Sequence, residues 1–294
     1  MIKRNWTKKG KKVICIDLFC GMGGATQGMI SAGAKVVLSV DGWEVAEYLH
    51  KLNYPDVPFE RRMLGEDPDA DLELLKKHLP DDLHNYHFHL HGSPPCQAFS
   101  GIAGNKRRPL SEGTKNVDYF LWLVEQLKPD SWSMENVPAT RKHYPHLPHE
   151  MLRAMDFGVP QRRRRFFAGE GWKTNPHSGP VVAWDEVIDA NGATALNTVG
   201  CSVSNSERAR RSDSALGEVS KTITRQQPTL RQEQPDGTFV VVGYVGSEDT
   251  AKLFGFPDGM DFTCGDHSIS DIRIAIGNSV APPVMEAVIN GIVK

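Results

Sequence analysis

Short apolar runs alternate with amphipathic segments over residues 13–168 of the chain. Runs of about four to eight apolar residues between turn-forming residues are typical of buried strands, and helical spacing of apolar positions is typical of helices. The pattern predicts strands at residues 13–19, 35–40, 86–91, 131–135 and 163–168. It predicts helices at residues 25–32, 44–52, 72–79, 119–127 and 149–155. Such alternation indicates an α/β fold with an open, doubly wound, mostly parallel sheet.

This rhythm ends after Gly171, where residues 172–244 become rich in serine, threonine, asparagine, glycine and glutamine. Short β-like pieces at residues 221–224 and 238–242 predict a small, irregular, β-leaning lobe. Helical spacing returns near the end of the chain, at residues 247–254 and 282–293. We therefore divide the chain into a first domain, the lobe, and a C-terminal segment that returns to the first domain: residues 1–171, 172–270 and 271–294.

The composition is that of an ordinary globular protein, with 39% hydrophobic residues among 294 and a net charge of −2. No apolar run approaches the length of a membrane span and no signal peptide is expected. The five cysteines are odd in number and form no Cys-x-x-Cys pair, which favours a reducing, intracellular setting. We expect the cytoplasm or nucleoid for a prokaryotic or viral chain and the nucleus for a eukaryotic one.

Positive charge is concentrated locally although the average is slightly acidic. A nucleic-acid binder needs a basic face rather than a basic average. The N-terminal lysines are expected to form a solvated tail, with phosphate contact or an address signal as alternatives. Three further basic clusters are Lys106-Arg107-Arg108, Arg162 to Arg165, and Arg208-Ala209-Arg210-Arg211.

Cys96 follows two prolines at the end of a predicted strand, in the string Gly92-Ser93-Pro94-Pro95-Cys96. The prolines stiffen the backbone and remove two strand donors, so the strand must stop before them. A thiol presented on such a turn suits a nucleophile. The alternative is that Cys96 is a small buried apolar residue.

A glycine-rich turn, Cys20-Gly21-Met22-Gly23-Gly24, follows the first predicted strand and precedes a helix. Glycines let a ligand approach the backbone at a helix N-terminus, and Asp41 at the end of the second strand suits ribose hydroxyls. The spacing departs from Gly-x-Gly-x-x-Gly because position 26 is Thr. The pattern favours an adenosine-containing cofactor, with a simple packing turn as the alternative.

Three histidines alternate along the predicted strand at residues 86–91 and would share one face: His87, His89 and His91. They could bind a metal, but no carboxylate or cysteine follows at ligand spacing. We expect no metal site.

Six motifs in order resemble those of the DNA cytosine-C5 methyltransferase family, which uses S-adenosylmethionine. The first resembles the cofactor motif, the next three the nucleophile, glutamate and arginine motifs, and the last two the C-terminal motifs. They are Asp17-Leu18-Phe19-Cys20-Gly21-Met22-Gly23-Gly24, Ser93-Pro94-Pro95-Cys96-Gln97, Glu135-Asn136-Val137, Gln161-Arg162-Arg163-Arg164-Arg165, Gly255-Phe256-Pro257-Asp258 and Gly277-Asn278-Ser279-Val280.

The resemblance implies a reaction in which Cys96 adds to C6 of cytosine, so that C5 can attack a methyl group. Free cysteine is only a few per cent thiolate at neutral pH, and Arg163 and Arg165 would raise that fraction. Glu135 would clamp N3 and the exocyclic amine as a protonated acid, which requires a raised pKa. Arg165 would hold the base O2 and Arg163 would support the catalytic group. The alternatives are a solvent-facing carboxylate for Glu135 and a phosphate-binding strip for the arginines.

By the same resemblance, S-adenosylmethionine is the expected cofactor. Phe19 would stack on its adenine, with core packing as the alternative. Gly42 stands where the family often has a tryptophan, and Trp43 comes one position later. The acid that contacts adenine is sought in Gly65-Glu66-Asp67, with Asp69 and Asp71 competing. The residues implied in cofactor binding are Asp17, Phe19, Gly21, Gly23, Gly24, Asp41, Pro94, Asn278 and Ser279.

The expected partner is duplex DNA, from which the target base must be flipped. The loop at residues 97–117 has glycines and a basic trio, so it could close over DNA and grip phosphates, or be a surface loop without a task. Residues 172–244 occupy the family's target-recognition position. The residues implied in DNA binding are Gln97, Ser100, Lys106, Arg107 and Arg108.

The resulting hypothesis is a Rossmann-like methyltransferase fold with a small target-recognition lobe. The chain would act as a monomeric DNA cytosine-5 methyltransferase, in a restriction-modification, viral or epigenetic setting. An RNA cytosine methyltransferase is one alternative. The transfer-RNA branch carries Cys-Phe-Thr in this lobe, whereas this chain has Phe262-Thr263-Cys264. A non-catalytic DNA-binding regulator is the other alternative, and intact Cys96, Glu135 and Arg165 argue against it.

Overall fold

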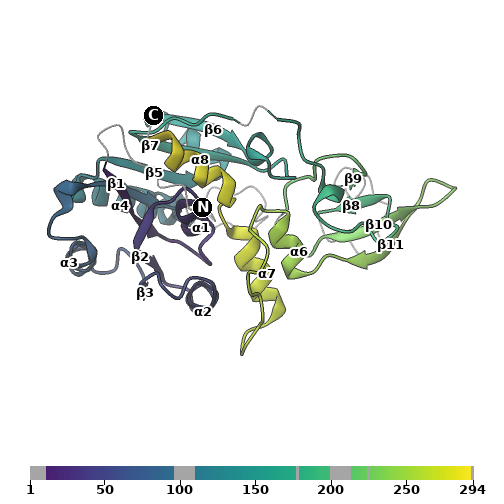
Figure 1. Cartoon of the computed structure of the whole chain (residues 1–294), viewed down its shortest axis with the longest axis horizontal. Coiled ribbons are helices and arrows are strands. Elements are labelled where there is room, and N and C mark those ends of the chain that lie inside the picture. Colours follow the sequence, from purple (N-terminus) through teal and green to yellow (C-terminus); the bar gives the residue numbers. More distant parts are fainter. Residues whose placement is uncertain (1–10, 96–109, 177–178, 199–212, 224–225, 293–294) are drawn as a thin grey trace.

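The computed structural model describes residues 11–95, 110–176, 179–198, 213–223 and 226–292. Figure 1 shows a large sheet flanked by helices, with a smaller sheet at one end of the molecule. The strands of the large sheet are β1 (Lys12–Leu18), β2 (Lys35–Asp41), β3 (Phe59–Arg61), β4 (Tyr86–Gly92), β5 (Ser131–Asn136), β6 (His149–Arg153) and β7 (Arg164–Glu170). Their spatial order is β3-β2-β1-β4-β5-β7-β6.

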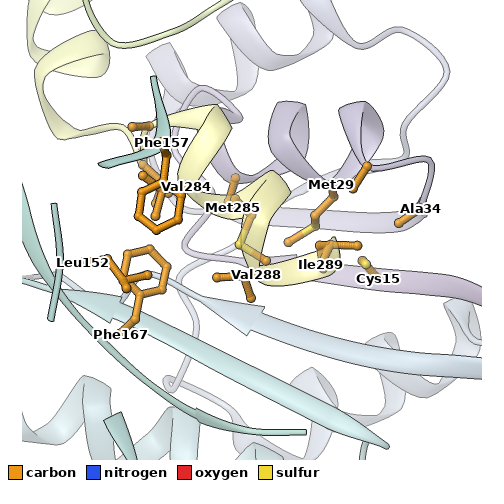
Figure 2. Packing of buried hydrophobic residues seen from close by; sticks show 14 of the residues in the cluster. Cys15, Met29, Ala34, Leu152, Phe157, Phe167, Val284, Met285, Val288 and Ile289 are labelled. Atoms are coloured by element: carbon orange, nitrogen blue, oxygen red, sulfur yellow. The ribbon is translucent and has the colours of Figure 1, made fainter. Parts of the chain in front are cut away.

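Helices cover both faces of this sheet. The helices of the first half are α1 (Gly24–Ser31), α2 (Glu44–Asn53), α3 (Pro68–His78) and α4 (Leu110–Leu127), and the last helix is α8 (Pro282–Ile292). On one face, α1 and α8 pack on Val13 and Cys15 of β1 and on Phe167 of β7, as Figure 2 shows for Cys15, Met29, Phe167 and Met285. On the other face, α3 and α4 pack on Ile14, Ile16 and Leu18. The two-sided burial explains the nearly continuous apolar run of β1.

The sheet is parallel from β3 to β5, and β7 reverses its direction. β7 pairs antiparallel with β5 on one side and with β6 on the other. The fold class predicted from the sequence, a doubly wound and mostly parallel sheet with a separate small lobe, is therefore confirmed.

The helix predicted at residues 149–155 is wrong. Residues His149–Arg153 form strand β6, and a short 3₁₀ turn follows at Ala154–Phe157. The segment is too short to form a stable helix on its own, and it pairs with the edge of β7, whose backbone groups would otherwise lack partners. Tertiary pairing overrides the local pattern here.

The small lobe contains a regular antiparallel sheet rather than scattered β-like pieces. Its strands are β8 (Ala195–Asn197), β9 (Asp213–Ala215), β10 (Thr229–Glu233) and β11 (Phe239–Tyr244), in the order β11-β10-β8-β9. The piece predicted at residues 238–242 lies in β11. The piece predicted at residues 221–224 is wrong for its described part, because Lys221 to Ile223 form no strand.

A third apolar core joins the lobe to helices of the rest of the molecule. This core combines lobe residues such as Trp184 and Leu230 with Leu49 of α2, and with α6 (Ser247–Lys252) and α7 (Ile269–Asn278). Helix α7 was not predicted, and it crosses the boundary proposed at residue 270. The division of the chain into three parts stays a proposal.

The C-terminal helices α7 and α8 form a long apolar stretch. Contrary to the expectation from the sequence, Ile269–Ile292 is, by length and composition alone, long and apolar enough to cross a membrane. The stretch is two helices, α7 and α8, and 67% of its most apolar part is buried inside the protein. Such burial is also found in core helices of globular proteins.

Close packing of α1 on α8 depends on Gly28. A Cβ at this position would lie 2.7 Å from Cβ of Met285 and would also press on the backbone carbonyl of Pro282. Helix propensity alone would make Gly28→Ala stabilising by roughly 0.5–1 kcal/mol. We expect the overlap with backbone to reverse this sign, so that the free energy of unfolding in urea falls by about 1–3 kcal/mol. Ser31→Ala, on the exposed end of α1, is the control and should change it little; a stabilised Gly28→Ala protein would contradict the packing argument.

Candidate active site

The glycine-rich turn lies between the end of β1 and the start of α1. Gly21 and Gly23 adopt positive φ angles of 55° and 99°, and Phe19 before them has φ 53°, which is uncommon for an aromatic residue. A Cβ on Gly21 would meet no atom of the described chain within 4 Å, whereas one on Gly24 would strike the segment before α8. The turn therefore offers open backbone at Gly21 and close packing at Gly24.

Asp41, at the end of β2, holds this turn in place. Its Oδ2 accepts the backbone N–H of Gly21 at 2.9 Å and its Oδ1 accepts that of Trp43 at 2.8 Å. Burial raises the pKa of Asp41, and these N–H donors oppose the rise. Each carboxylate oxygen keeps a second lone pair, so Asp41 can brace the turn and also accept a ligand hydroxyl.

Asp17 lies near the end of β1, just before the turn, and is completely buried. Its Oδ2 accepts the hydroxyl of Thr26 at 2.7 Å, and Thr26 is also 3.2 Å from Oγ of Ser39. The second oxygen, Oδ1, has no hydrogen-bond partner among the residues that the structure describes. Burial raises the pKa of Asp17 to about 7. Oδ1 of Asp17 is therefore a buried polar atom that is available for a hydrogen bond to a ligand.

The segment before the predicted nucleophile is held at the ends of three strands. The backbone N–H of Ser93 donates to the carbonyl of Leu18 at 3.0 Å. The carbonyl of Pro94 accepts Nδ2 of Asn136 at 3.1 Å, and Oδ1 of Asn136 accepts the hydroxyl of Thr140 at 2.9 Å. Asn136 was not among the predicted site residues, although it stands in the glutamate motif.

Several predicted residues fall outside the described part of the chain, which stops at Pro95 and resumes at Leu110. These are Cys96, Gln97, Ser100, Lys106, Arg107 and Arg108.

Glu135 and Arg165 form an ion pair at the end of β5. The distance from Nε of Arg165 to Oε1 of Glu135 is 3.0 Å. Burial raises the pKa of Glu135, and the positive charges of Arg165 and Arg163 oppose the rise. As expected from strand alternation, Arg163 is buried and Arg165 half-buried, whereas Arg162 is exposed on the other face.

Arg163 joins the sheet to the rest of the molecule. Its Nη2 donates to the carbonyl of Ser279 at 2.9 Å, and its guanidinium lies 4.9 Å from the ring centre of Phe254. Gln161, two residues earlier, donates to the carbonyl of Leu253 at 3.2 Å and accepts the N–H of Ile223 at 3.1 Å. Gln161 was also missed by the sequence analysis, although it opens the arginine motif.

Of the two C-terminal residues predicted for the cofactor, Ser279 lies beside the glycine turn. Ser279 packs next to Gly24. Its hydroxyl donates to the carbonyl of Ala275 in α7 at 2.9 Å, so the hydroxyl hydrogen is already used in this bond. Asn278 is exposed.

The acidic residues after β3 fall into two groups. Asp71 is completely buried, pairs with Arg62 and accepts the N–H of Gly65 at 2.8 Å. Asp67 caps α3 by accepting the N–H of Ala70 at 3.1 Å, and Glu66 and Asp69 are exposed. Asp71 is therefore committed to holding its own loop, which leaves the exposed acids for a ligand.

In the ranges that the structure describes, no cluster of three or more histidine, cysteine, aspartate or glutamate side chains is arranged to hold a metal ion.

Comparison with known families decides what these motifs belong to. Residues 13–170 match the model of the C-5 cytosine-specific DNA methylases. The chain belongs to this family. It is 30% identical over 207 residues to the type II methylase M.HgiDII of Herpetosiphon aurantiacus, covering 63% of this chain and 55% of that one. It is 24% identical to the type II methyltransferase M.HaeII of Haemophilus aegyptius, over 97% of this chain and 94% of that one.

Solved structures of methyltransferases share the fold. A DNA modification methyltransferase encoded within an E. coli prophage matches with a TM-score of 0.64 at 20% identity, over 95% of this chain and 98% of that one. The Dnmt2 methyltransferase of S. pombe matches with a TM-score of 0.62 at 16% identity, over 96% and 98%. The chain spans about half the length of three curated relatives that it matches, M.HgiDII, M.HindV and M.HgiDI.

The raised pKa of Asp17 makes a prediction about stability and pH. The folded protein retains a proton on Asp17 up to about pH 7, whereas the unfolded chain releases it near the ordinary value of 3.8. Its stabilising contribution is therefore present at low pH and is lost as the pH rises through this window. Relative to Asp17→Asn, the wild-type free energy of unfolding should fall by about 1.4 kcal/mol per pH unit.

Urea unfolding of the ligand-free wild type and Asp17→Asn at several pH values measures this difference. Comparing the two proteins cancels the opposite contribution of buried His50, whose pKa burial lowers to about 3. Two parallel stability curves between pH 4 and 7 would show that Asp17 is ionised in the folded protein.

Proposed function

We propose that this protein transfers a methyl group from S-adenosylmethionine to C5 of a cytosine flipped out of duplex DNA. One observation carries the proposal. The Glu135–Arg165 ion pair, the Ser93-Pro94-Pro95 segment that precedes Cys96, and the glycine turn all lie at the same end of the sheet. Membership of the C-5 cytosine-specific DNA methylase family supports the reading.

Cys96 is proposed as the nucleophile. C5 of cytosine is too poor in electrons to take a methyl group unaided. In the proposed reaction the Cys96 thiolate adds to C6, and the electron pair of the C5–C6 double bond is thereby made available at C5. C5 would then take the methyl group, and the bonding pair of the broken carbon–sulfur bond would stay on the cofactor sulfur. Transfer of the C5 proton to water would return an electron pair to the ring and expel the thiolate.

Glu135 and Arg165 are proposed to hold the base. Burial raises the pKa of Glu135. We therefore propose that Glu135 is protonated rather than ion-paired when the base is bound, so that it donates a hydrogen bond to N3 and neutralises the negative charge that develops there. The guanidinium of Arg165, which lies beside Glu135, would donate to O2 of the ring. Arg163 is proposed to act on this pair through its charge, because its own donors bind the Ser279 carbonyl.

The residues around the turn fit S-adenosylmethionine. The backbone is open at Gly21, Oδ1 of the buried Asp17 has no partner among the described residues, and Asp41 keeps spare lone pairs. These features match a ligand that carries an ammonium group, which would favour the ionised form of Asp17, and ribose hydroxyls. Phe19 and Pro94 border the same end of the sheet. When bound, this cofactor supplies an electrophilic methyl group.

DNA contact is assigned to the loop that carries Lys106, Arg107 and Arg108, and sequence choice to the lobe at residues 172–244. A restriction-modification setting is in line with the type II relatives. A monomer, an intracellular location and the absence of a membrane or metal partner are proposed on the grounds given by the sequence.

Cys96→Ser is expected to abolish methyl transfer while leaving the fold and cofactor binding intact. Transfer of a radiolabelled methyl group to duplex DNA and, in parallel, to RNA measures both activity and substrate class. Duplex DNA containing 5-fluorocytosine should trap the wild type as a complex that survives denaturant, because fluorine at C5 cannot leave as a proton.

Cys264→Ser, at a partly exposed cysteine, is the matched control and should retain activity and trapping. Full activity of Cys96→Ser, or absence of a trapped complex with active wild type, would refute the nucleophile. Preferential labelling of RNA would replace DNA as the substrate, and no transfer to either would favour a binding protein.

Asp41→Asn is expected to weaken binding of S-adenosylhomocysteine by about 1–3 kcal/mol in calorimetry. The change removes a charged acceptor that both braces the Gly21 turn and is proposed to meet the ribose. Asp56→Asn, at an exposed aspartate, is the control. NAD should not bind the wild type, and NAD binding would contradict the choice of cofactor. Unchanged affinity of Asp41→Asn for S-adenosylhomocysteine would show that Asp41 does not contact the ribose.

A further inference from the structure

Histidines of β4 and serines of β5 alternate along a hydrogen-bonded row between the two strands. In the register of these parallel strands, His89 lies beside Ser131 and His91 beside Ser133. Strand alternation places His87 on the same face of the sheet. This histidine-serine ladder continues beyond the strand to Ser93, in the segment that precedes the proposed nucleophile.

Every neighbouring pair in the ladder is within hydrogen-bond distance. His87 Nε2 is 2.8 Å from Ser131 Oγ, which is 2.8 Å from His89 Nδ1. His89 Nε2 is 2.9 Å from Ser133 Oγ, which is 2.7 Å from His91 Nδ1. His91 Nε2 is 3.1 Å from Ser93 Oγ.

The inner members of the ladder are inaccessible to water. His89, His91 and Ser133 are completely buried. Burial lowers the pKa of His89 well below its ordinary value and that of His91 to about 3. The rings are therefore neutral at physiological pH, each with one donor nitrogen and one acceptor nitrogen.

Neutral rings give the ladder a direction. A serine that joins two rings accepts a hydrogen bond from one and donates to the other. A continuous chain then has only two proton arrangements: all three histidines carry hydrogen on Nε2 and donate towards Ser93, or all three carry it on Nδ1 and Ser93 donates. The tautomers of distant rings are thus coupled, and so is the orientation of the Ser93 hydroxyl.

Ser93 is a junction between this ladder and the site. Its hydroxyl contacts His91, its backbone N–H is bound by Leu18, and the next carbonyl, of Pro94, is bound by Asn136. Leu18, His91 and Asn136 stand at or near the ends of β1, β4 and β5. Two of these three contacts bind the backbone of residues 93 and 94, and the ladder supplies the third, to the side chain of Ser93.

We propose that the histidine-serine ladder is a positioning device, which fixes the segment at residues 93–95 for methyl transfer. The inference rests on the proposed function and deepens it. Serines and histidines in these parallel, doubly buried strands stand where apolar residues would fill the space equally well. Hydrogen bonds depend on direction, whereas apolar packing does not. The ladder therefore sets the rotation of the Ser93 side chain as well as its distance from His91.

Ser133→Ala tests the proposal because it breaks the ladder at its centre, away from the reacting atoms. We expect kcat to fall about tenfold, with KM for cofactor and DNA within about twofold of wild type, since small misplacement of reacting groups acts on the chemical step. Ser133→Thr returns the hydroxyl and should restore most of the lost kcat. Thr174→Ala removes another buried hydroxyl, one that donates to Glu150 away from the site, and is the matched control.

A second readout does not need activity. Nitrogen-15 NMR of histidine-labelled protein reports which ring nitrogen carries hydrogen. In wild type, His87, His89 and His91 should share one tautomer, and Ser133→Ala should change the tautomer balance of His89 or His91 while Thr174→Ala leaves it unchanged. Ser93→Ala, at a partly exposed position, cuts the last link and should lower kcat similarly even if Ser133→Ala fails to fold.

The outcomes separate the two proposals. Wild-type protein without methyl-transfer activity would defeat the proposed function, while the NMR result would still report on the ladder. Mixed tautomers in wild type would overturn the continuous ladder. The positioning role would be overturned if the wild type is active and the ladder variants have the same kcat as the control Thr174→Ala. The ladder variants are Ser93→Ala and, if it folds, Ser133→Ala.

Discussion

The reversed direction of β7 is the constraint on which the candidate site depends. Glu135 is near the carboxyl end of β5, and it lies opposite Phe167 in the antiparallel register. Arg165 precedes Phe167 by two residues, so it falls on the same face and just beyond Glu135. If β7 ran parallel to β5, an arginine at the start of β7 would lie at the amino end of β5, far from Glu135. The Glu135–Arg165 pair therefore follows from strand direction, and burial of both groups between β5 and β7 makes their charges matter.

The same strand start ties the lobe to the sheet. Gln161 and Arg163 bind backbone groups of Ile223, Leu253 and Ser279, which belong to the lobe and to the C-terminal segment. These are hydrogen bonds to buried carbonyls and an amide, and their loss would leave polar groups without partners. Arg163 also donates to the carbonyl of Ile223 at 3.4 Å, so the lobe directly contacts a residue whose charge acts on Glu135. The structure thus couples the part proposed to select DNA to the part proposed to react with it.

The sequence predicted the parts of this fold that have a strong local signal. Strands buried on both faces, such as β1, are continuous apolar runs, and the glycine turn follows from residues that tolerate positive φ. Strand β6 was predicted as a helix because its pairing with β7 is not a local property. The site motifs named Glu135 and Arg165, but no sequence pattern shows that Asn136 binds the Pro94 carbonyl, since that contact joins residues 42 apart.

One sequence signal for function was present in the alternation itself. Parallel strands buried on both faces are usually apolar throughout, yet β4 and β5 alternate histidine or serine with Phe88, Leu90, Trp132 and Met134. The apolar members all face α3 and α4 in one core. The polar members face the side covered by α8, the side on which register places Asp17 and Glu135. A sheet that buries polar groups on one face only must satisfy them with one another, because α8 presents mainly apolar side chains there. The histidines and serines of β4 and β5 therefore form the histidine-serine ladder, which ends at Ser93, next to the place of the proposed chemistry.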